Sequence, residues 1–539
     1  MKFTYYVLFI LLSSAFMACD SSTSTAESDK KRPNILFIMS DDHAYQAISS
    51  YSDRLLETPN IDRLAKEGIQ FNNACVTNSI CAPSRATILT GKHTHINGKI
   101  DNRMPFDTTQ ITFPQLFQDN GYETAMYGKL HFGNNPKGVD DFMILPGQGN
   151  YINPKFITPR GDTTITGYVT DIITDLTLNW LDKKRDKEKP FMLMYLHKAP
   201  HRPWWPSPTK FKEFTQKTFP EPETLFDDYR NRGTAAKTAE MNLLTHMMYS
   251  HDSKVYPETI VEMGDKVQPK VKEWNNSFYG PYNRSNEAQK KLYKPILDKI
   301  NADFKENWPT MTDEEKMKWK FQRYMQDYLA CISSVDDNVG RVLNYLDDSG
   351  LTENTIVVYT SDQGFYLGEH GWFDKRFIYN ESFKTPLLIR WPNEVTPGTT
   401  NEEMVQNLDF AQTFLEIAGI TAPSDMQGES IVPLLKGNDA QWTRDAVYYQ
   451  YYEYPSVHMV KRHYGIVTKE YKLAHFYYDV DEWELYDRKK DLNEMNNVYD
   501  DPAYADVVAD LKIQLQDLRT QYKDSDELDQ KYIDAYSKN

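Results

Sequence analysis

Cysteine is scarce in this chain, which has four in 539 residues. Cys19 lies in an N-terminal segment of distinct composition, and the other three are Cys75, Cys81 and Cys331. An odd number in an oxidising compartment cannot form the disulfide framework that stabilises small secreted domains. One of these cysteines therefore needs another explanation.

Basic residues are also in deficit, because 61 Lys and Arg stand against 77 Asp and Glu, for a formal net charge of −16. Nucleic acids and other polyanions are held along extended faces of clustered Lys and Arg. The charge balance therefore argues against nucleic acid as a partner, while a small basic pocket remains possible.

Long apolar runs are missing except near the N-terminus, where Lys2 precedes an apolar stretch from Tyr5 to Met17 that is too short to span a bilayer. Ala18-Cys19 and a polar segment follow, a pattern that resembles a bacterial lipoprotein signal with Cys19 lipidated; plain cleavage is the alternative. We expect a signal peptide over 1–19 and a tether over 20–32. The protein would then lie in the periplasm or be an outer-membrane lipoprotein of a Gram-negative bacterium, reaching the membrane through its lipid only.

The rest of the chain is long and apolar enough for a large core, with 40% hydrophobic and 13% aromatic residues. From Arg32 to about Trp391, short apolar runs alternate with helical patterns, which predicts an α/β fold with a large, mostly parallel sheet sandwiched by helices. Residues 207–320 are predicted to be inserted surface helices and loops. We expect a catalytic domain over 33–440 and, over 441–539, a smaller C-terminal α+β subdomain with an antiparallel sheet and a helix.

Polar residues follow four of the predicted strands. In open α/β sheets the ligand site lies beyond the carboxyl ends of the strands, so these residues should meet. They are Asp41 and Asp42, Lys129 and His131, His197 and His201, and Asp362 and Gln363.

Asp41, Asp42, Asp362 and Gln363 together offer only oxygen ligands. Hard oxygen donors suit Ca²⁺ or Mg²⁺ rather than zinc, and we favour calcium. Taken alone, Asp41-Asp42 would equally suit a turn or a helix cap.

The most specific motif is Cys81-Ala-Pro-Ser-Arg85, with Gly91 six residues later. From average residue usage, C-x-P-S-R arises by chance in roughly one chain in a thousand of this size. Pro83 favours the first turn of a helix and Gly91 its end, so Cys81 should begin a helix. The positive end of the helix dipole there favours an anion.

This motif resembles the signature of the type I, formylglycine-dependent sulfatases of the alkaline phosphatase superfamily. Further blocks match in family order, namely 34–42, 128–131, 197–201, 361–364 and 373–376. The resemblance implies that a formylglycine-generating or anaerobic sulfatase-maturating enzyme oxidises Cys81 to formylglycine. The hydrate of the formylglycine aldehyde would attack a sulfate ester to give a covalent sulfo-enzyme.

The resemblance also implies residue roles. Asp41, Asp42, Asp362 and Gln363 would hold the cation together with the modified Cys81, Gln363 replacing the commoner Asn or His. Arg85 and Lys129 would steady the aldehyde hydrate and His131 would assist it. The sulfate would contact Lys129, His201 and Lys375, and either His201 or Lys375 would protonate the leaving oxygen.

The C-terminal blocks resemble the N-acetylglucosamine-6-sulfatase branch. They imply a substrate carrying the 6-O-sulfate of N-acetyl- or N-sulfoglucosamine, as in heparan sulfate and heparin, either as oligosaccharide or as monosaccharide. Arg376, Glu453, Arg462 and His463 are the further candidates for substrate contacts. Alternatives are a sulfatase for galactosamine 6-sulfate, galactose or uronate sulfates, a phosphate or phosphonate monoester hydrolase, and a non-catalytic surface glycan-binding lipoprotein.

Overall fold

The computed structural model describes Met1, residues 31–274 and residues 276–537. Apart from Met1, the predicted signal peptide with Cys19 and the tether up to residue 30 lie outside the described residues. The chain from Pro33 onward forms one compact unit, and the predicted boundary at residue 440 stays a prediction. Within the described residues, no helix is both long and apolar enough to cross a membrane.

The main sheet has ten strands in the order β13-β2-β12-β9-β1-β8-β4-β5-β6-β7. Its centre is parallel and contains β9 (Thr355–Ser361), β1 (Asn34–Ser40), β8 (Phe191–Leu196), β4 (Glu123–Gly128) and β5 (Asp141–Ile144). Antiparallel pairs occur on both flanks, in β12 (Leu387–Arg390), β2 (Ile69–Phe71), β6 (Lys155–Thr158) and β7 (Gly161–Thr164), while β13 (Thr399–Asn401) runs parallel to β2. The sheet is therefore mixed, with a parallel core as the sequence predicted.

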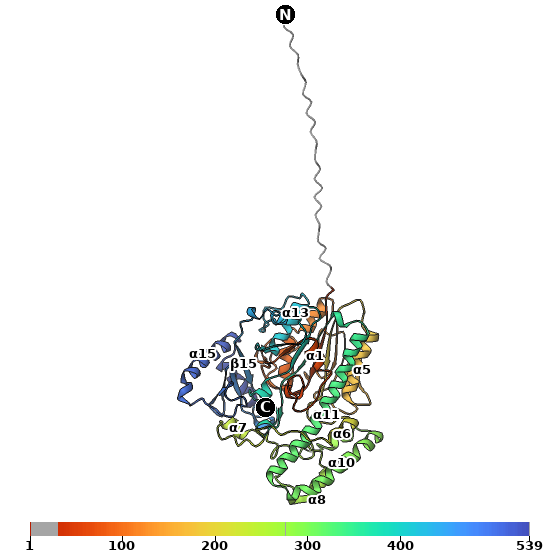
Figure 1. Ribbon diagram of the computed structural model, residues 1–539, viewed down its shortest axis with the longest axis vertical. Helices are drawn as coiled ribbons and strands as arrows, with labels where there is room; N and C mark the ends of the chain where they lie inside the picture. Colours follow the sequence, from red (N-terminus) through yellow and green to blue (C-terminus); the bar gives the residue numbers. More distant parts are fainter. Residues whose placement is uncertain (2–30, 275, 538–539) are drawn as a thin grey trace. The chain divides into compact units, whose positions relative to one another are not determined.

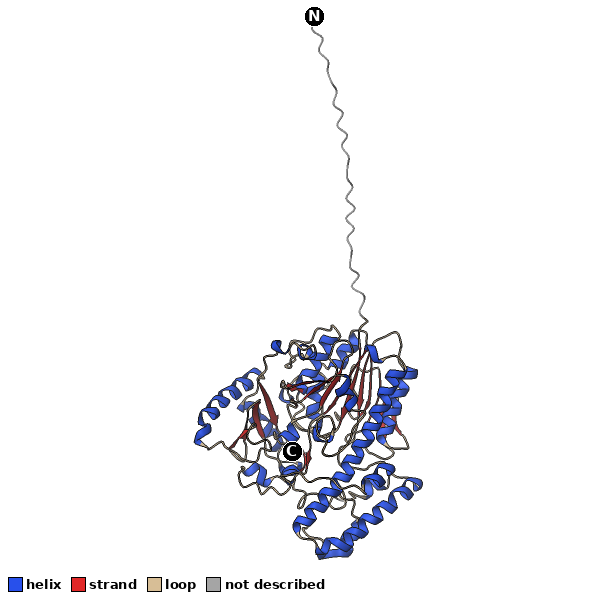
Figure 2. Ribbon diagram, viewed as in Figure 1, coloured by secondary structure: helices blue, strands red, loops and turns tan. Residues whose placement is uncertain are grey.

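Helices cover both faces of this sheet (Figures 1 and 2). Alternate residues of a strand point to opposite faces. Phe37 of β1 packs with α2 (Cys81–Thr90), α4 (Phe113–Asp119) and α13 (Phe410–Ile417). Its neighbour Leu36 belongs to the core on the other face, with α5 (Val169–Asn179) and α11 (Asp313–Asp348). This double burial explains why the strand reads as a continuous apolar run.

Helix α2 carries the Cys81 motif and is buried along its whole length. Ile80 precedes it in an extended conformation, and Gly91 ends it with φ 61°, donating its N–H to the carbonyl of Thr87. A left-handed residue after the last turn is the usual role of glycine at a helix end. The predicted helix, with Cys81 as its first residue, is confirmed.

The segment between β8 and α11 consists of helices and loops, as predicted for the insertion. It contains α6 (Pro208–Phe214), α7 (Thr234–Thr238), α8 (Pro257–Met263), α9 (Tyr279–Tyr282) and α10 (Glu287–Asn307). Helices α6, α8 and α10 form the lower lobe in Figure 1. Asn286 begins α10 with a capping box, its side chain accepting from the amide of Gln289.

A four-stranded antiparallel sheet forms the predicted C-terminal subdomain. Its strands are β15 (Ala446–Tyr451), β16 (His463–Thr468), β17 (Tyr471–Phe476) and β18 (Glu482–Asp487), paired in chain order. Helix α15 (Ala505–Gln521) packs on this sheet and α16 (Asp526–Ser537) follows it. Shorter elements complete the fold: α1 (Asp62–Glu67), β3 (Ala74–Cys75), α3 (Thr94–Asn97), β10 (Tyr366–Leu367), β11 (Phe373–Asp374), α12 (Asn380–Phe383), β14 (Val405–Gln406) and α14 (Val432–Leu435).

Candidate active site

Four neighbouring parallel strands, β4, β8, β1 and β9, end at one edge of the sheet and deliver the polar residues predicted there. Backbone hydrogen bonds continue past the strand ends. The amides of Lys129, His197 and Asp362 donate to the carbonyls of Leu196, Met39 and Ser40, respectively. The residues after each strand are therefore fixed relative to the others by the sheet itself.

Gly128 lets β4 approach β8 closely enough to place Lys129. Its φ is 113°, and a Cβ added there would lie 1.7 Å from the carbonyl oxygen of Leu196. No other residue fits this position without moving the strand.

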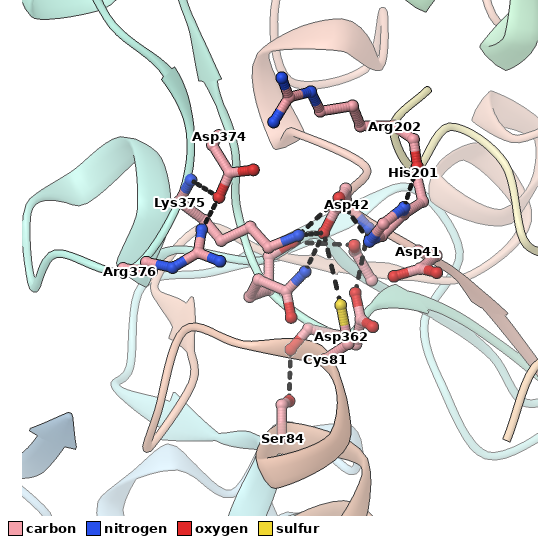
Figure 3. Close-up of polar contacts among 12 residues, drawn as sticks. Asp41, Asp42, Cys81, Ser84, His201, Arg202, Asp362, Asp374, Lys375 and Arg376 are labelled. Atoms are coloured by element: carbon pink, nitrogen blue, oxygen red, sulfur yellow. Dashed lines mark hydrogen bonds and ion pairs between the residues drawn. The ribbon is translucent and has the colours of Figure 1, made fainter. Parts of the chain in front are cut away.

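Asp42 lies at the centre of the site (Figure 3). Its backbone N–H donates to Oδ1 of Asp362 at 3.0 Å. Its carboxylate accepts from Gln363 Nε2 and from the ammonium group of Lys375, which lies 2.7 Å from both oxygens. The Sγ of Cys81 is 3.9 Å from Oδ1 of Asp42. The first residue of α2 and the end of β1 thus face each other.

Arg85 and Lys129 compensate the other two carboxylates. The guanidinium of Arg85 lies 2.9 Å from Oδ2 of Asp362, through both Nε and Nη2, and 3.6 Å from Oδ1 of Asp41. The ammonium group of Lys129 pairs with Oδ2 of Asp41. With every group ionised, three carboxylates meet three cations, so an added divalent cation would make the site electropositive and attract an anion.

The residues present fit a metal ion. Ligand atoms of Asp41, Asp42, Cys81 and His201 lie within 4.8 Å of one another, and all four residues are buried. Among the described residues, Oδ1 of Asp41 and Oε1 of Gln363 accept no hydrogen bond, although both atoms are buried. Buried oxygen acceptors without donors are what a hard cation requires. The sequence predicted Asp41, Asp42 and Cys81 as ligands and placed His201 at the same edge of the sheet. The roles of Asp362 and Gln363 as ligands stay predictions.

The carboxylates differ in their preference for a proton. Burial, with Asp41 nearby, raises the pKa of Asp362 to about 7 against the opposing effect of Arg85. Burial likewise raises the pKa of Asp42. Burial favours the protonated form of Asp41 as well, but the positive charges of Lys129 and Arg85 outweigh it and hold its pKa well below the ordinary value. Such crowded, buried carboxyl groups mark a functional site.

Burial opposes a positive charge on the histidines of the site. Nδ1 of His201 bonds to the carbonyl of Arg202, and its Nε2 lies 3.7 Å from Oδ2 of Asp42. Burial, then Lys129, lowers the pKa of His201 and that of His131 well below the ordinary value. His197 is a core residue whose ring packs 4.4 Å from that of Tyr195.

A second group of polar residues borders the site and includes several that the sequence did not single out. Arg376 pairs with Oδ1 of Asp374, whose Oδ2 lies 3.3 Å from Nε2 of His458. His458 donates from Nδ1 to the carbonyl of Glu240 at 2.7 Å. Its Nε2 is therefore an acceptor, and a hydroxyl group could donate to it or to Oδ2 of Asp374.

Arg202 adjoins this group and is held by the insertion. Its guanidinium makes two bonds to Asp252, at 2.6 and 2.7 Å, and lies between the rings of Trp274 and Phe373 at 4.9 and 5.0 Å. Its Nη1 is 3.5 Å from Nε2 of His458. The region whose role was unreadable from sequence thus contributes Asp252 and Trp274 beside the site.

Three residues that were predicted to contact substrate are buried and hydrogen-bonded within the fold. Glu453 is 3% exposed and accepts from the backbone of Asn102. His463 is fully buried, bonding through Nδ1 to the carbonyl of Lys461 and accepting at Nε2 from the amide of Ile378. Arg462, also fully buried, donates to the carbonyl of Tyr454. These side chains are hydrogen-bonded within the fold, and their contact with substrate stays a prediction.

Two family models match the chain: "Sulfatase" over residues 33–420, and "N-sulphoglucosamine sulphohydrolase, C-terminal" over residues 368–521. An N-acetylglucosamine-6-O-sulfatase of Bacteroides thetaiotaomicron is 46% identical over 524 residues, covering 96% of this chain and 91% of that protein. An ulvan-active sulfatase of Formosa agariphila is 24% identical over 551 residues, covering 98% and 90%.

Solved structures agree with these matches. The structure of BT4656 in complex with its substrate D-glucosamine-2-N,6-O-disulfate has 46% sequence identity and a TM-score of 0.87, covering 92% of this chain and 99% of that one. A phosphonate monoester hydrolase of Agrobacterium radiobacter, at 20% identity and a TM-score of 0.62 over 92% and 93% of the chains, shares the fold alone.

Proposed function

The chain belongs to the sulfatase family, and we propose that its substrates are carbohydrates carrying a 6-O-sulfate on N-acetyl- or N-sulfoglucosamine, as in heparan sulfate and heparin. As a sulfatase it is a hydrolase of sulfuric esters. The proposal on the sugar rests on the relatives at 46% identity, and N-acetylglucosamine-6-sulfatases of Capra hircus and Homo sapiens are 25% and 24% identical. Another relative at 24% identity is an ulvan-active sulfatase, so the low-identity matches alone do not fix the sugar.

The observation that carries the proposal is the setting of Cys81. Its side chain starts a buried helix and faces Asp42 and Lys375 at the carboxyl edge of the sheet. Burial raises the pKa of the thiol, so an unmodified cysteine there is a poor nucleophile. We propose that Cys81 is oxidised to formylglycine by a formylglycine-generating or anaerobic sulfatase-maturating enzyme. The hydrate of the modified side chain would supply the oxygen that attacks sulfur. Its second hydroxyl group would then allow sulfate to be released, a route that a cysteine lacks.

We propose Ca²⁺ as the cation held by Asp41, Asp42, Asp362 and Gln363. All four side chains offer oxygen, which calcium prefers, and the three carboxylates supply the charge that it needs. When bound, the ion would polarise a sulfate oxygen and lower the barrier to attack on sulfur.

The basic side chains suit the remaining steps. Lys129 and Lys375 would bind sulfate oxygens and stabilise the charge that develops on them. Burial opposes the charge on Lys375, but the carboxylate of Asp42 outweighs it and raises its pKa, so this side chain stays a cation that can donate a hydrogen bond to the leaving oxygen. His131, kept neutral, is suited to accept a proton from residue 81.

Sugar recognition would fall to the group around Asp374. Asp374 and His458 present adjacent acceptor atoms 3.3 Å apart, and Arg376 and Arg202 present donors next to them. Such an arrangement suits vicinal hydroxyl groups, each of which donates and accepts. Hydroxyl-binding groups next to the proposed sulfate position are what a sulfated sugar requires.

We also propose that the protein is exported. Lys2, the apolar stretch to Met17 and Ala18-Cys19 support a lipoprotein signal, and thus a periplasmic or outer-membrane location with membrane contact through the lipid only.

Sulfate release decides the function. Protein whose residue 81 has been identified as formylglycine by mass spectrometry should release sulfate from glucosamine 6-sulfate and its N-acetyl and N-sulfo forms. Galactosamine 6-sulfate and the matching phosphate esters should be poor substrates. Activity on galactosamine alone would overturn the proposed specificity, and phosphate release without sulfate release would overturn the reaction.

A further inference from the structure

The helix that carries Cys81 begins with backbone amides that its own hydrogen bonds do not use. The first amides of any helix lack partners within it. Ile80, which precedes α2, provides no side-chain cap, and Pro83 has no N–H. Ser84 is the first residue whose amide bonds within the turn, to the carbonyl of Ile80. Ala82, next to the nucleophile position, therefore needs an acceptor from elsewhere.

Asn102 supplies that acceptor. Its Oδ1 lies 3.2 Å from the backbone nitrogen of Ala82, although twenty residues separate them. Asn102 sits in the loop after α3, which is folded tightly on itself: Oδ1 of Asp101 accepts from the amides of Arg103 and Met104. The loop thus presents Asn102 in a defined position.

Glu453 connects this loop to the C-terminal subdomain. Its Oε2 accepts from the backbone nitrogen of Asn102 at 2.9 Å, and its Oε1 accepts from Ser456 at 3.3 Å. Glu453 lies just after β15 and is 3% exposed. A carboxylate held in this way from two sides is a rigid support rather than a mobile surface group.

The opposite side of the first turn is held as well. Ser84 donates from Oγ to the backbone carbonyl of Asp362, and Nδ2 of Asn407 donates to the same Oγ at 2.8 Å. The turn is therefore fixed to the metal-binding strand end through Ser84 and to the C-terminal subdomain through Ala82. Residue 81 lies at the start of this doubly held turn.

We propose that Asn102, supported by Glu453, is a positioning residue that sets where the side chain of residue 81 stands relative to Asp42 and Lys375. The inference rests on the proposed function. Freed from Asn102, the first turn would shift or fray, and misplacing reacting atoms by about 1 Å costs up to about a hundredfold in rate. Binding of the sugar, made by other residues, would change little.

The first test compares Asn102→Ala, Asn102→Asp and the wild type at equal formylglycine content, measured by peptide mass spectrometry. We expect Asn102→Ala to lower kcat by about tenfold to a hundredfold, with KM changed less than about threefold. Asn102→Asp keeps the acceptor oxygen and should restore most of kcat, while its negative charge raises KM for an anionic substrate.

A matched control is Asn286→Ala, which removes the same kind of cap from α10 in the insertion. It should cost stability, about 1 kcal/mol as caps generally do, and leave kcat unchanged. Wild-type kcat in Asn102→Ala, or an equal loss of kcat in Asn286→Ala, would overturn the proposal.

Hydrogen exchange tests the contact without any turnover. The amide of Ala82 should exchange at least tenfold faster in Asn102→Ala than in the wild type, while amides in the middle of α2 keep their rates. Unchanged exchange at Ala82 overturns the proposal whatever the activity. If the wild type released no sulfate from any ester, the proposed function would fail, and the exchange result would still decide the role of Asn102.

Discussion

The ammonium nitrogen of Lys375 lies 2.7 Å from each carboxylate oxygen of Asp42. Both side chains are buried, so this pair acts where water screens little. Lys375 thus adjoins both the proposed cation and the proposed sulfate position. Its removal should affect catalysis more than folding.

We expect Lys375→Met to lower kcat/KM by about a hundredfold to a thousandfold, the usual cost of losing a donor that stabilises transition-state charge. Lys320→Met is the matched control, because Lys320 is a buried lysine that donates to the carbonyls of Leu244 and Met247. That variant should lose stability and keep its kcat. Similar kcat values in the two variants would contradict the role of Lys375.

Replacement of Cys81 should abolish turnover without unfolding the protein. Cys81→Ala removes one sulfur atom and the only group that the proposed oxidation could act on, so no sulfate release should remain. Circular dichroism should match that of the wild type. Cys331→Ala is the comparison, since its thiol lies in the core beside Tyr168 and should affect only stability. Residual activity in Cys81→Ala above that of buffer would exclude this nucleophile.

Removal of calcium should abolish activity reversibly. Dialysis against a chelator would remove the ion proposed to polarise the sulfate, and added Ca²⁺ should restore turnover. Because the ion binds only the folded state, the melting temperature should also rise with Ca²⁺ concentration. Asp362→Asn should weaken this rise. A melting temperature that does not respond to Ca²⁺ after chelation would contradict the proposed site.

Sugar recognition can be separated from sulfate chemistry. Asp374→Ala should raise KM for glucosamine 6-sulfates by about tenfold or more, because one hydrogen bond to a charged group contributes about 1.5–3 kcal/mol. Turnover of a simple aryl sulfate, which has no sugar hydroxyls, should change much less. An equal loss on both substrates would place Asp374 in the sulfate chemistry instead.

The last helix, α16, should loosen as pH rises through neutrality. Burial, and then Asp524, raise the pKa of Asp529 to about 7, well above its ordinary value. When folding raises the pKa of a carboxyl group, the group contributes to the free energy of unfolding. This contribution is fully present below the unfolded pKa and is lost as pH rises through the folded pKa. Between pH 6 and pH 8 we expect a loss on the order of 1 kcal/mol.

Asp529→Asn tests this, since an amide oxygen in the place of Oδ1 can still accept from Gln450 and Tyr477. Its NH2 group would then face Arg519, a cost in stability that does not depend on the titration of residue 529. The melting temperature of the variant relative to the wild type should be higher at pH 8 than at pH 6. An identical pH dependence in both proteins would mean that Asp529 does not titrate in this range.

The sequence was sufficient to predict the site where its residues follow buried strands. Asp41, Lys129, His201 and Asp362 could be grouped because parallel strands share a carboxyl edge, and the motif at Cys81 marked the helix start. Lys375 followed from the family resemblance, and Asp374 beside it could have been found in the same block.

Residues that depend on long-range packing could not be predicted. Asp252 and Trp274 reach the site from an insertion without a sequence signal, and His458 reaches it from the loop after β15. Glu453, Arg462 and His463 were chosen by their chemical type within C-terminal blocks that resemble the N-acetylglucosamine-6-sulfatase branch. The fold buries them, because charged and aromatic side chains also serve as internal supports, and single-sequence patterns do not separate the two uses.

The burial of α2 imposes an order on biosynthesis. Residue 81 has no exposed surface and its whole helix is enclosed, so an enzyme that must hold the surrounding peptide cannot reach it in the finished protein. The proposed oxidation then has to precede packing of the helix. The active fraction of a preparation would be fixed by competition between two rates, that of modification and that of folding. Once folded, an unmodified molecule would remain inactive however stable it is.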